Sequence, residues 1–497
     1  MPRPASPDQR TAQPRFPAPG VRDFGFRDFG FRQTSFRTEQ MRPRILIDGF
    51  NLALEHGTGV STYARNLSYR LGTAGAEVEV LYGRHVNPKW SDLIKEIAFF
   101  DDPAIERMTF TRRMRRLRRT LMAGFGETAT EIPVTGRVVA DTYASRMPHF
   151  DRLWNVEDVF NRAHNRFKMF PRSVPVNLPG AAPTIAHWTY PLPMRMPGAK
   201  NIYTFHDLVP LRLPFTTLDH KRRYFRLCRM LLAQSDHIVT VSEASRRDII
   251  NLLGAPPEKV TNTYQSVELP PSLANKPEDQ ARDEIRGAFG LEWKGYHLFF
   301  GAIEPKKNLG RLIEAHLVSG VETPLVILGK QAWKSDQELQ LLFEDHQRWM
   351  TNQGESKLTQ RKLREKIILL DYAPFRLLVS VIRGAKSVLF PSLYEGFGLP
   401  ALEAMSLGTP VLTSNTSSLP EVVGDAAVKV NPYDIRAMVE GIRALDSDGE
   451  LREHLAWAGR RQAATYSAAA YERRLADVYA RLGATLEPGT EEVPLED

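Results

Sequence analysis

From residue 44 onward the chain alternates between short apolar runs and longer stretches in which polar and apolar residues mix. Short runs bounded by turn residues predict buried strands, and the mixed stretches predict helices. Such alternation favours parallel sheets covered by helices on both faces. The first half has predicted strands at Ile45–Asp48, Val78–Tyr82, Thr184–His187, Asn201–Phe205 and His237–Val241, and predicted helices at 217–234 and 243–253.

The alternation restarts after a polar stretch, residues 268–290, which is rich in Pro, Asp and Glu and is predicted to be a linker. The second half has predicted strands at His297–Gly301, Leu325–Leu328, Ile367–Leu370, Ser387–Phe390 and Pro410–Thr413. Because ligands of doubly wound sheets bind at the carboxyl ends of strands, two facing halves predict a cleft between two domains. The predicted domains are 44–267 and 291–460, followed by a helix at 461–484 that crosses back to the first domain and an acidic tail at 485–497.

Composition agrees with a soluble globular protein, and 497 residues are too many for one ordinary core. No run of about 18 apolar residues predicts a membrane-spanning helix. The single cysteine, Cys228, excludes an intramolecular disulfide and a cysteine-based metal cluster, and fits a cytoplasmic setting. The net charge of +8 is local, because residues 1–40 contribute +3 and residues 112–119 hold six arginines.

Residues 1–43 are predicted to be a disordered extension. They repeat RDFGF in tandem at 22–31 and have almost no branched aliphatic residues with which to form a core. A basic arm that binds lipid or nucleic acid is the functional alternative to a dispensable extension. A third hypothesis is that the native chain begins at Met41, and mass spectrometry of the native protein would test it.

A glycine-containing loop that enters a helix is the most informative motif of the second half. The predicted strand ends at Phe390, and a loop with two glycines leads into a predicted helix at Leu399–Leu407. A helix N-terminus of this kind suits phosphate, and carboxylates beside it suit sugar or ribose hydroxyls. Glu395 and Glu403, eight residues apart, flank the motif. Taken alone, it could equally be a strand–turn–helix with solvated glutamates.

A second cluster follows the first strand of that half, in GAIEPKKNLGRL at 301–312. Lys306 and Lys307 stand at the strand end, where they suit a diphosphate, and Asn308 is predicted to cap the next helix. A single lysine would more often be a solvated surface charge, but two adjacent ones in this domain favour the functional interpretation.

These motifs together resemble the retaining glycosyltransferases of family 4. EGFGLPALE resembles their E-x7-E signature, and GAIEPKKN, GTPVLTSNTSSLPEVVGDAA and VSEASRRDI resemble its surroundings. The resemblance covers about residues 44–480 and is weak in 85–180. It implies the GT-B fold, an α/β architecture of two facing Rossmann-like doubly wound domains with an interdomain cleft.

The resemblance also implies roles for individual residues. Glu395 would lie near the donor sugar, and Glu403 would accept from ribose hydroxyls. The diphosphate would be held by Lys307 and by the backbone amides of Phe397, Gly398 and Leu399. The chain departs from many members at Ala302, where they have an arginine, and Lys306 would compensate for it only in part because it cannot form a bidentate fork.

In the first half, His206 follows a predicted strand, and related enzymes have a histidine there that contacts the donor sugar. Asp207 would orient it. Gly57 and Gly59 match the family's first glycine-rich loop, near the phosphate or the acceptor. His187 and Trp188, the weakest candidates, would line the acceptor side.

The family retains anomeric configuration and needs no metal. The D-x-D at 446–448 is predicted to be a turn, so neither a metal nor a cofactor is expected.

The implied donor is a GDP- or UDP-linked hexose, and mannose is the hexose that we expect first. The implied acceptor is a saccharide or a lipid-diphosphate-linked saccharide in cell-surface polysaccharide synthesis. Alternatives are an epimerase or phosphorylase on this scaffold, or a nucleic-acid-binding protein that uses the arginine clusters.

The cluster Arg112–Arg119 lies in TRRMRRLRRTL, where Met114, Leu117 and Leu121 form one narrow apolar stripe. Such a helix suits the anionic surface of an inner membrane leaflet, which would make the protein peripheral. The alternative, weighed equally from the residues alone, is a charged helix that packs by this stripe. No nucleic-acid partner is expected.

Overall fold

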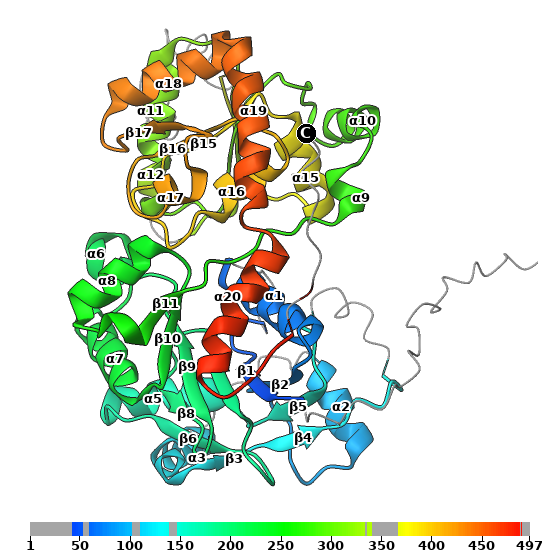
Figure 1. Ribbon diagram of the computed structural model, residues 1–497, viewed down its shortest axis with the longest axis vertical. Helices are drawn as coiled ribbons and strands as arrows, with labels where there is room; N and C mark the ends of the chain where they lie inside the picture. The colour runs from blue at the N-terminus through cyan, green and yellow to red at the C-terminus, as the bar shows by residue number, and fades with distance from the viewer. Residues whose placement is uncertain are drawn as a thin grey trace, which may run out of the picture. The chain divides into compact units, whose positions relative to one another are not determined.

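The computed structural model describes residues 42–52, 59–101, 110–138, 147–332, 335–339, 366–487 and 489 (Figure 1). Residues 1–41 of the predicted extension, Gly57 and most of the predicted acidic tail lie outside these ranges. The described residues form two Rossmann-like domains. We call them the N-terminal lobe, built on the first sheet together with the last helix, and the C-terminal lobe, built on the second sheet.

The N-terminal lobe contains an eight-stranded sheet in the order β11-β10-β9-β7-β1-β2-β5-β4. All neighbours are parallel except β4, which pairs antiparallel with β5 at the edge. The strands are β1 (Arg44–Asp48), β2 (Glu77–Tyr82), β4 (Thr130–Ile132), β5 (Arg152–Asn155), β7 (Ile185–Trp188), β9 (Lys200–Thr204), β10 (His237–Thr240) and β11 (Val260–Asn262).

Besides the last helix of the chain, the described part of this lobe has seven α-helices and a small second sheet. The three-stranded sheet contains β3 (Glu127–Thr128), β6 (Val174–Asn177) and β8 (Met194–Arg195). Two of these strands, β3 and β6, lie in the region 85–180, where the resemblance is weak. The helices are α1 (Gly59–Thr73), α2 (Asp92–Phe100), α3 (Phe110–Met122), α5 (Val159–Met169), α6 (Val209–Arg212), α7 (Lys221–Gln234) and α8 (Glu243–Leu253).

The C-terminal lobe contains an all-parallel, six-stranded sheet in the order β14-β13-β12-β15-β16-β17. Numbered from its first strand, this is the order 3-2-1-4-5-6 of dinucleotide-binding folds, with a topological switch point between β12 and β15. The strands are β12 (His297–Phe300), β13 (Leu325–Leu328), β14 (Ile367–Leu370), β15 (Ser387–Phe390), β16 (Val411–Ser414) and β17 (Val428–Val430).

Helices cover this second sheet: α9 (Pro271–Ala274), α10 (Glu278–Phe289), α11 (Leu309–Ser319), α12 (Ser335–Glu338), α15 (Phe375–Gly384), α16 (Leu399–Ser406), α17 (Leu419–Val423), α18 (Ile435–Ser447) and α19 (Gly449–Ala464). The segment predicted as a linker, 268–290, therefore holds two helices. Most of its polar residues face solvent, but Ala281, Ile285 and Lys276 are buried, and Glu284 pairs with Lys276 and accepts a hydrogen bond from Ser380 of α15.

The chain ends by returning to the N-terminal lobe. After a break at 465–467, α20 (Ala468–Arg481) packs beside α1, as Figure 1 shows in red. Its buried Tyr471, Leu475 and Tyr479 join the core of the first lobe, and Glu472 pairs with Arg70 at 3.0 Å. The crossing segment predicted at 461–484 therefore contains the end of α19, the break and α20.

Candidate active site

Four charged side chains meet at the switch point of the C-terminal lobe, where the loops after β12 and β15 adjoin. Lys307 Nζ lies 2.7 Å from Glu395 Oε1, and both residues are buried. Lys306 Nζ lies 4.0 Å from Glu395 Oε2 and 3.4 Å from Glu304 Oε1. The site thus joins the two clusters that the sequence singled out.

Glu304 was not a sequence-based candidate, although it stands two residues before the lysine pair. Its carboxylate, with that of Glu395, balances the two ammonium groups, so this quartet has no net charge. Burial alone would raise the pKa of Glu395, but the Lys307 and Lys306 ammonium groups hold it below its usual range. Burial opposes the charge of Lys306, yet the carboxylates of Glu395 and Glu304 raise the pKa of Lys306 overall.

Asn308 has a different role from the predicted helix cap. Its backbone is left-handed, with φ of 61°, and its side chain makes no capping hydrogen bond to α11. Instead Nδ2 donates to the carbonyls of Pro391 at 3.1 Å and Pro432 at 2.7 Å. The capping prediction was wrong because the side chain fixes the neighbouring loops to the lysine loop.

The glycine loop delivers the N-terminus of α16 to this charge cluster. Gly398 has φ of +114°, and a Cβ there would lie 2.7 Å from Leu419 Cδ2, so glycine is required on both counts. The N–H groups of Phe397, Gly398 and Leu399 have no acceptor within the described ranges. They therefore form a donor set suited to an anion.

Phe397 anchors this loop to the junction between the lobes. Its buried ring lies 5.5 Å from the Tyr466 ring and 6.4 Å from the Tyr264 ring, measured between centroids. Tyr264 precedes the second lobe and Tyr466 lies in the break before α20. The amides of 397–399 are therefore held by the two segments through which the lobes are connected.

Glu403 stands apart from the quartet, on the second turn of α16. It is half-buried, and its carboxylate has no hydrogen bond or ion pair with any described residue. Desolvation raises the pKa of Glu403 from 4.5 to about 7. An unpaired carboxylate in such a place is available to accept from ligand hydroxyl groups.

Two predicted residues of the N-terminal lobe face this loop. His206 is half-buried, its Nε2 lies 2.9 Å from the Thr189 carbonyl, and burial lowers the pKa of His206. A Cβ on Gly396 would lie 2.7 Å from the His206 carbonyl oxygen and 3.2 Å from Asp207 Cβ. The strand end at 206–207 and the glycine loop therefore touch, which brings His206, Asp207 and Glu395 to one place.

Gly59, the described member of the predicted glycine pair, begins α1. A Cβ at Gly59 would lie 3.5 Å from Leu399 Cδ1, so the start of α1 faces the start of α16. The first loop of the N-terminal lobe therefore ends beside the anion-binding amides.

His187 and Trp188 do not line the acceptor side, and their assignment there was wrong. Both are fully buried within β7. The His187 ring is hydrogen-bonded to Tyr479 of α20 and, at 2.8 Å, to Thr204 Oγ1. Trp188 Nε1 donates to Asn201 Oδ1 at 3.1 Å. These side chains fasten the sheet to α20 and fill the core.

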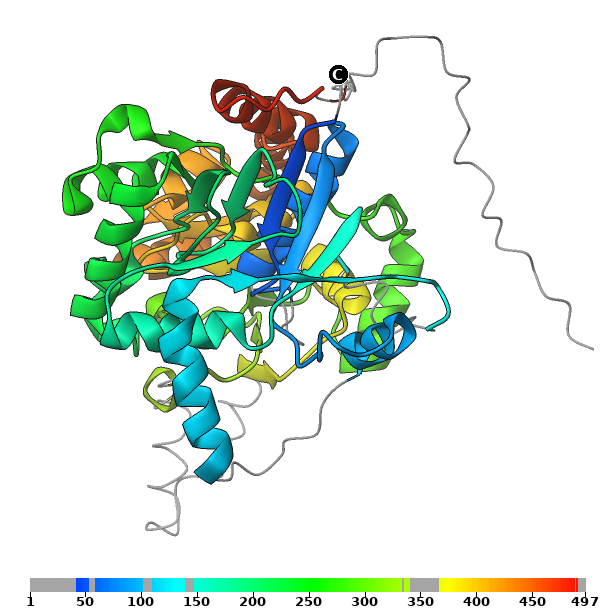
Figure 2. The same cartoon turned by 90° about the horizontal axis from the view of Figure 1, so that it is seen from below.

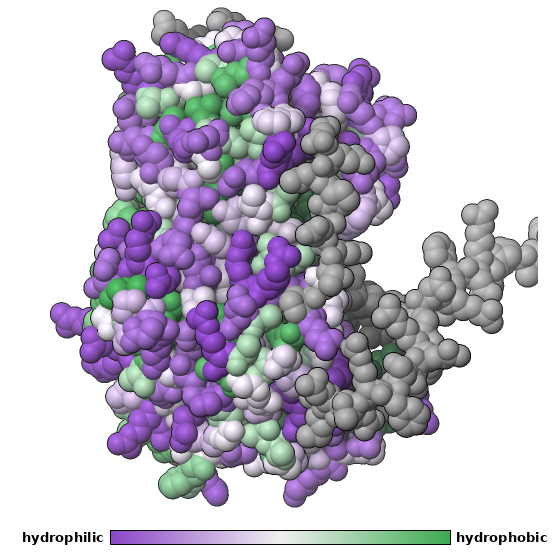
Figure 3. Space-filling view, viewed as in Figure 1, coloured by the Kyte–Doolittle hydropathy of each residue, from purple (hydrophilic) through white to green (hydrophobic). Residues whose placement is uncertain are grey.

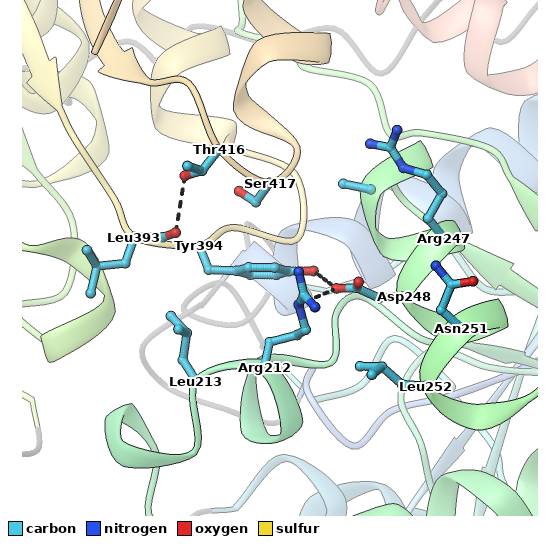
Figure 4. Close-up of a pocket in the computed structure, with 11 residues that line it drawn as sticks. Arg212, Leu213, Arg247, Asp248, Asn251, Leu252, Leu393, Tyr394, Thr416 and Ser417 are labelled. Carbon is cyan, nitrogen blue, oxygen red and sulfur yellow. Dashed lines mark hydrogen bonds and ion pairs between the residues drawn. The ribbon is translucent and has the colours of Figure 1, made fainter. Parts of the chain in front are cut away.

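A cavity of about 500 Å³ lies between the lobes beside the site (Figure 4). Tyr394, next to Glu395, points into it and donates a hydrogen bond to Asp248 of α8, which also pairs with Arg212 at 3.4 Å. Glu421 of α17 completes this contact between the lobes, because its carboxylate accepts from the N–H groups of Glu243 and Ala244, each at 3.0 Å.

The aspartates of the D-x-D stretch have structural partners. Asp446 pairs with Lys386 at 2.8 Å and accepts from Thr323 Oγ1 at 2.6 Å, while Asp448 caps α19 by accepting from Leu451 N. The described residues contain no group of three or more His, Cys, Asp or Glu side chains that could hold a metal ion.

Comparison with known proteins identifies the family. A family model described as Glycosyl transferases group 1 matches residues 281–462, and one described as Glycosyltransferase Family 4 matches residues 137–269. O-antigen chain mannosyltransferase B of Escherichia coli is 34% identical over 283 residues, which cover 56% of this chain and 68% of that protein. The chain belongs to the family 4 glycosyltransferases.

This glycosyltransferase is also 27% identical over 455 residues to the MMP alpha-(1->4)-mannosyltransferase of Mycolicibacterium hassiacum, covering 86% of this chain and 97% of that protein. Among solved structures, sucrose-phosphate synthase from Thermosynechococcus elongatus has a TM-score of 0.57 at 16% identity, covering 89% of this chain and 99% of that one. These likenesses confirm the family 4 resemblance and the GT-B fold predicted from the sequence.

Proposed function

We propose that this glycosyltransferase moves mannose from a nucleoside-diphosphate sugar, GDP- or UDP-linked, to a saccharide or lipid-linked saccharide with retention of configuration. The observation that carries the donor class is the meeting of Lys307, Glu395 and the free amides of 397–399 at one switch point. Mannose is favoured because relatives named as mannosyltransferases match the chain. One relative is named an O-antigen chain mannosyltransferase, and this name favours a surface polysaccharide as the product.

The reaction develops negative charge on the leaving diphosphate and positive charge on the anomeric carbon. The amides of 397–399 and the ammonium groups of Lys306 and Lys307 would stabilise the first, in an orientation that exists before the reaction. Glu395 and the strand end at His206 and Asp207 would position the sugar. Glu403 would accept from ribose hydroxyls. We propose that the reaction needs no metal ion.

Thermal-shift titration with GDP, UDP and dTDP, and with the corresponding sugars, tests the donor. We expect GDP and GDP-mannose to raise the melting temperature most, and to raise it less in Glu403→Gln. Transfer is then measured with and without EDTA, and the anomeric configuration of the product is read by NMR. Stabilisation by none of these nucleotides, or a product of inverted configuration, would contradict the proposal.

We further propose that the enzyme works on the cytoplasmic face of a membrane and touches it through α3. The side chains of its apolar stripe are exposed, Met114 to 52%, Leu117 to 44% and Leu121 to 41%. The stripe therefore does not pack inward, as it would in the alternative of a charged helix that packs by this stripe. Figure 2 shows α3 in cyan projecting from the rest of the lobe. Among the described residues, no helix has the length and apolar character to cross a bilayer. Sedimentation with anionic vesicles at low salt tests this contact, and Leu117→Ser/Leu121→Ser should weaken it.

A further inference from the structure

A second exposed surface lies around the start of α7, which follows the strand end at 206–207 in the sequence. None of its residues was a candidate from the sequence. Phe215 is 60% exposed, Leu218 74% and Phe225 40%. Three arginines of α7, Arg222, Arg223 and Arg226, are exposed among them. We call these six residues the α6–α7 surface.

The arginines of this surface have no partner within the described part of the chain. Neighbouring cations are already engaged, because Arg212 pairs with Asp248 and Lys221 Nζ donates to the Thr217 carbonyl at 2.6 Å. Asp219 is the only acidic residue between 212 and 229. The surface therefore carries three uncompensated charges in the first turns of one helix.

Interleaved cationic and apolar side chains indicate the kind of partner. A polyanion such as nucleic acid would neutralise the arginines but would leave Leu218, which is 74% exposed, in contact with water. An anionic bilayer offers phosphate headgroups to the arginines and hydrocarbon to the apolar side chains. Figure 3 shows hydrophobic patches among hydrophilic residues over the side of the lobe where Figure 1 labels α6 and α8.

This surface is rigidly tied to the site. Tyr224, which lies between Arg223 and Phe225, points inward, and its hydroxyl donates to the Asp207 carbonyl at 3.2 Å. The N–H of Arg223 is capped by His220. The first turn of α7 thus cannot change orientation without disturbing the strand end that carries His206.

We propose that the α6–α7 surface docks on an anionic bilayer and thereby holds the strand end 206–207 at a fixed orientation to a membrane-bound acceptor. The acceptor part of this proposal rests on the proposed function. The docking part depends only on the surface itself and makes a second contact besides α3.

Vesicle sedimentation of the full chain tests it, with phosphatidylcholine alone or mixed with phosphatidylglycerol. The test variant is Arg222→Gln/Arg223→Gln/Arg226→Gln, and Phe215→Ser/Leu218→Ser tests the apolar part. The matched control, Arg282→Gln/Arg286→Gln/Arg436→Gln, removes the same charge from exposed arginines of the C-terminal lobe. We expect the test variant to lower partitioning into anionic vesicles on the order of 100-fold and the control to lower it far less.

Equal partitioning of the test and control variants would overturn the proposal. The proposal would also be overturned if the wild-type chain did not bind anionic vesicles but bound duplex nucleic acid or self-associated through this surface. Transfer to a short, lipid-free saccharide acceptor should be unchanged in the arginine variant, since none of its residues contacts the site. If the wild type sediments with vesicles but transfers no sugar, the proposed function fails while the docking surface stands.

Discussion

The two lobes share the parallel strand order of a Rossmann fold, yet they bring different chemistry to their facing edges. The C-terminal edge carries the quartet of Glu304, Lys306, Lys307 and Glu395, with an unpaired Glu403 nearby. The N-terminal edge carries His206, whose pKa is lowered by burial, and one carboxylate, Asp207. Charged side chains are therefore concentrated where a diphosphate would leave, whereas the N-terminal edge adds one histidine and one carboxylate where a sugar would be positioned.

Removing charge from the C-terminal edge should have the largest effect. Lys307→Met deletes the cation nearest to Glu395, so we expect kcat/KM to fall by about 10²-fold or more, as when a preorganised charge stabiliser is lost. The buried Glu395 carboxylate would also lose its nearer cation, with Lys306 left at 4.0 Å, so stability should fall too. Rates are therefore normalised to folded protein. Lys429→Met is the control, because Lys429 is exposed and its partners in the preceding turn, Asp425 and the Gly424 carbonyl, lie away from the quartet. Undiminished transfer by Lys307→Met would refute the assignment.

The N-terminal edge should respond less strongly. His206→Ala removes a ring that is held by the Thr189 carbonyl and packs edge-on to Tyr63, with centroids 4.8 Å apart. We expect kcat/KM to fall on the order of 10- to 100-fold through poorer positioning of the sugar. The affinity for free nucleoside diphosphate should be unchanged, as calorimetry can show. A loss of nucleotide affinity equal to the loss of rate would place His206 on the phosphate side instead.

His187 sharpens this comparison, because it looks equivalent to His206 in the sequence. His187→Leu leaves the hydroxyl of Tyr479 without its ring partner inside the core. We expect the free energy of unfolding in urea to drop by about 1–3 kcal/mol. The kcat/KM of the folded fraction should stay within about twofold of the wild type, since the ring is remote from solvent. A rate defect without a stability defect would restore His187 to the acceptor side.

The two histidines also show what sequence alone could provide. The two motifs of the C-terminal site were predictable because each is local: a strand end followed by the lysine pair, and a strand, a glycine loop and a helix start around Glu395. His187 and His206 both follow apolar runs, and only the register decides that one lies inside β7 and the other beyond β9. The partner of His187 is Tyr479, 292 residues away, and no local pattern indicates that α20 returns there. Glu304 was missed for a similar reason, since its charge matters only through Lys306.

The smallest expected effect concerns Glu403, the group without a partner. Its pKa is about 7 in the folded chain and 4.5 when exposed, so between these values the folded chain holds a proton that the unfolded chain has released. Stability should therefore decline as pH rises from 4.5 to 7. Since solvent reaches this half-buried carboxyl, we expect the contribution to be on the order of 1 kcal/mol.

Glu403→Gln should flatten that decline and make the variant the more stable form above pH 7. Below pH 4.5 the two proteins should have equal stability, because both carry a neutral side chain there. Urea unfolding at a series of pH values, without nucleotide, measures the difference. Identical pH profiles would mean that Glu403 is already paired in solution. It would then resemble Glu395 and would no longer be the free acceptor for ribose that distinguishes it from the quartet.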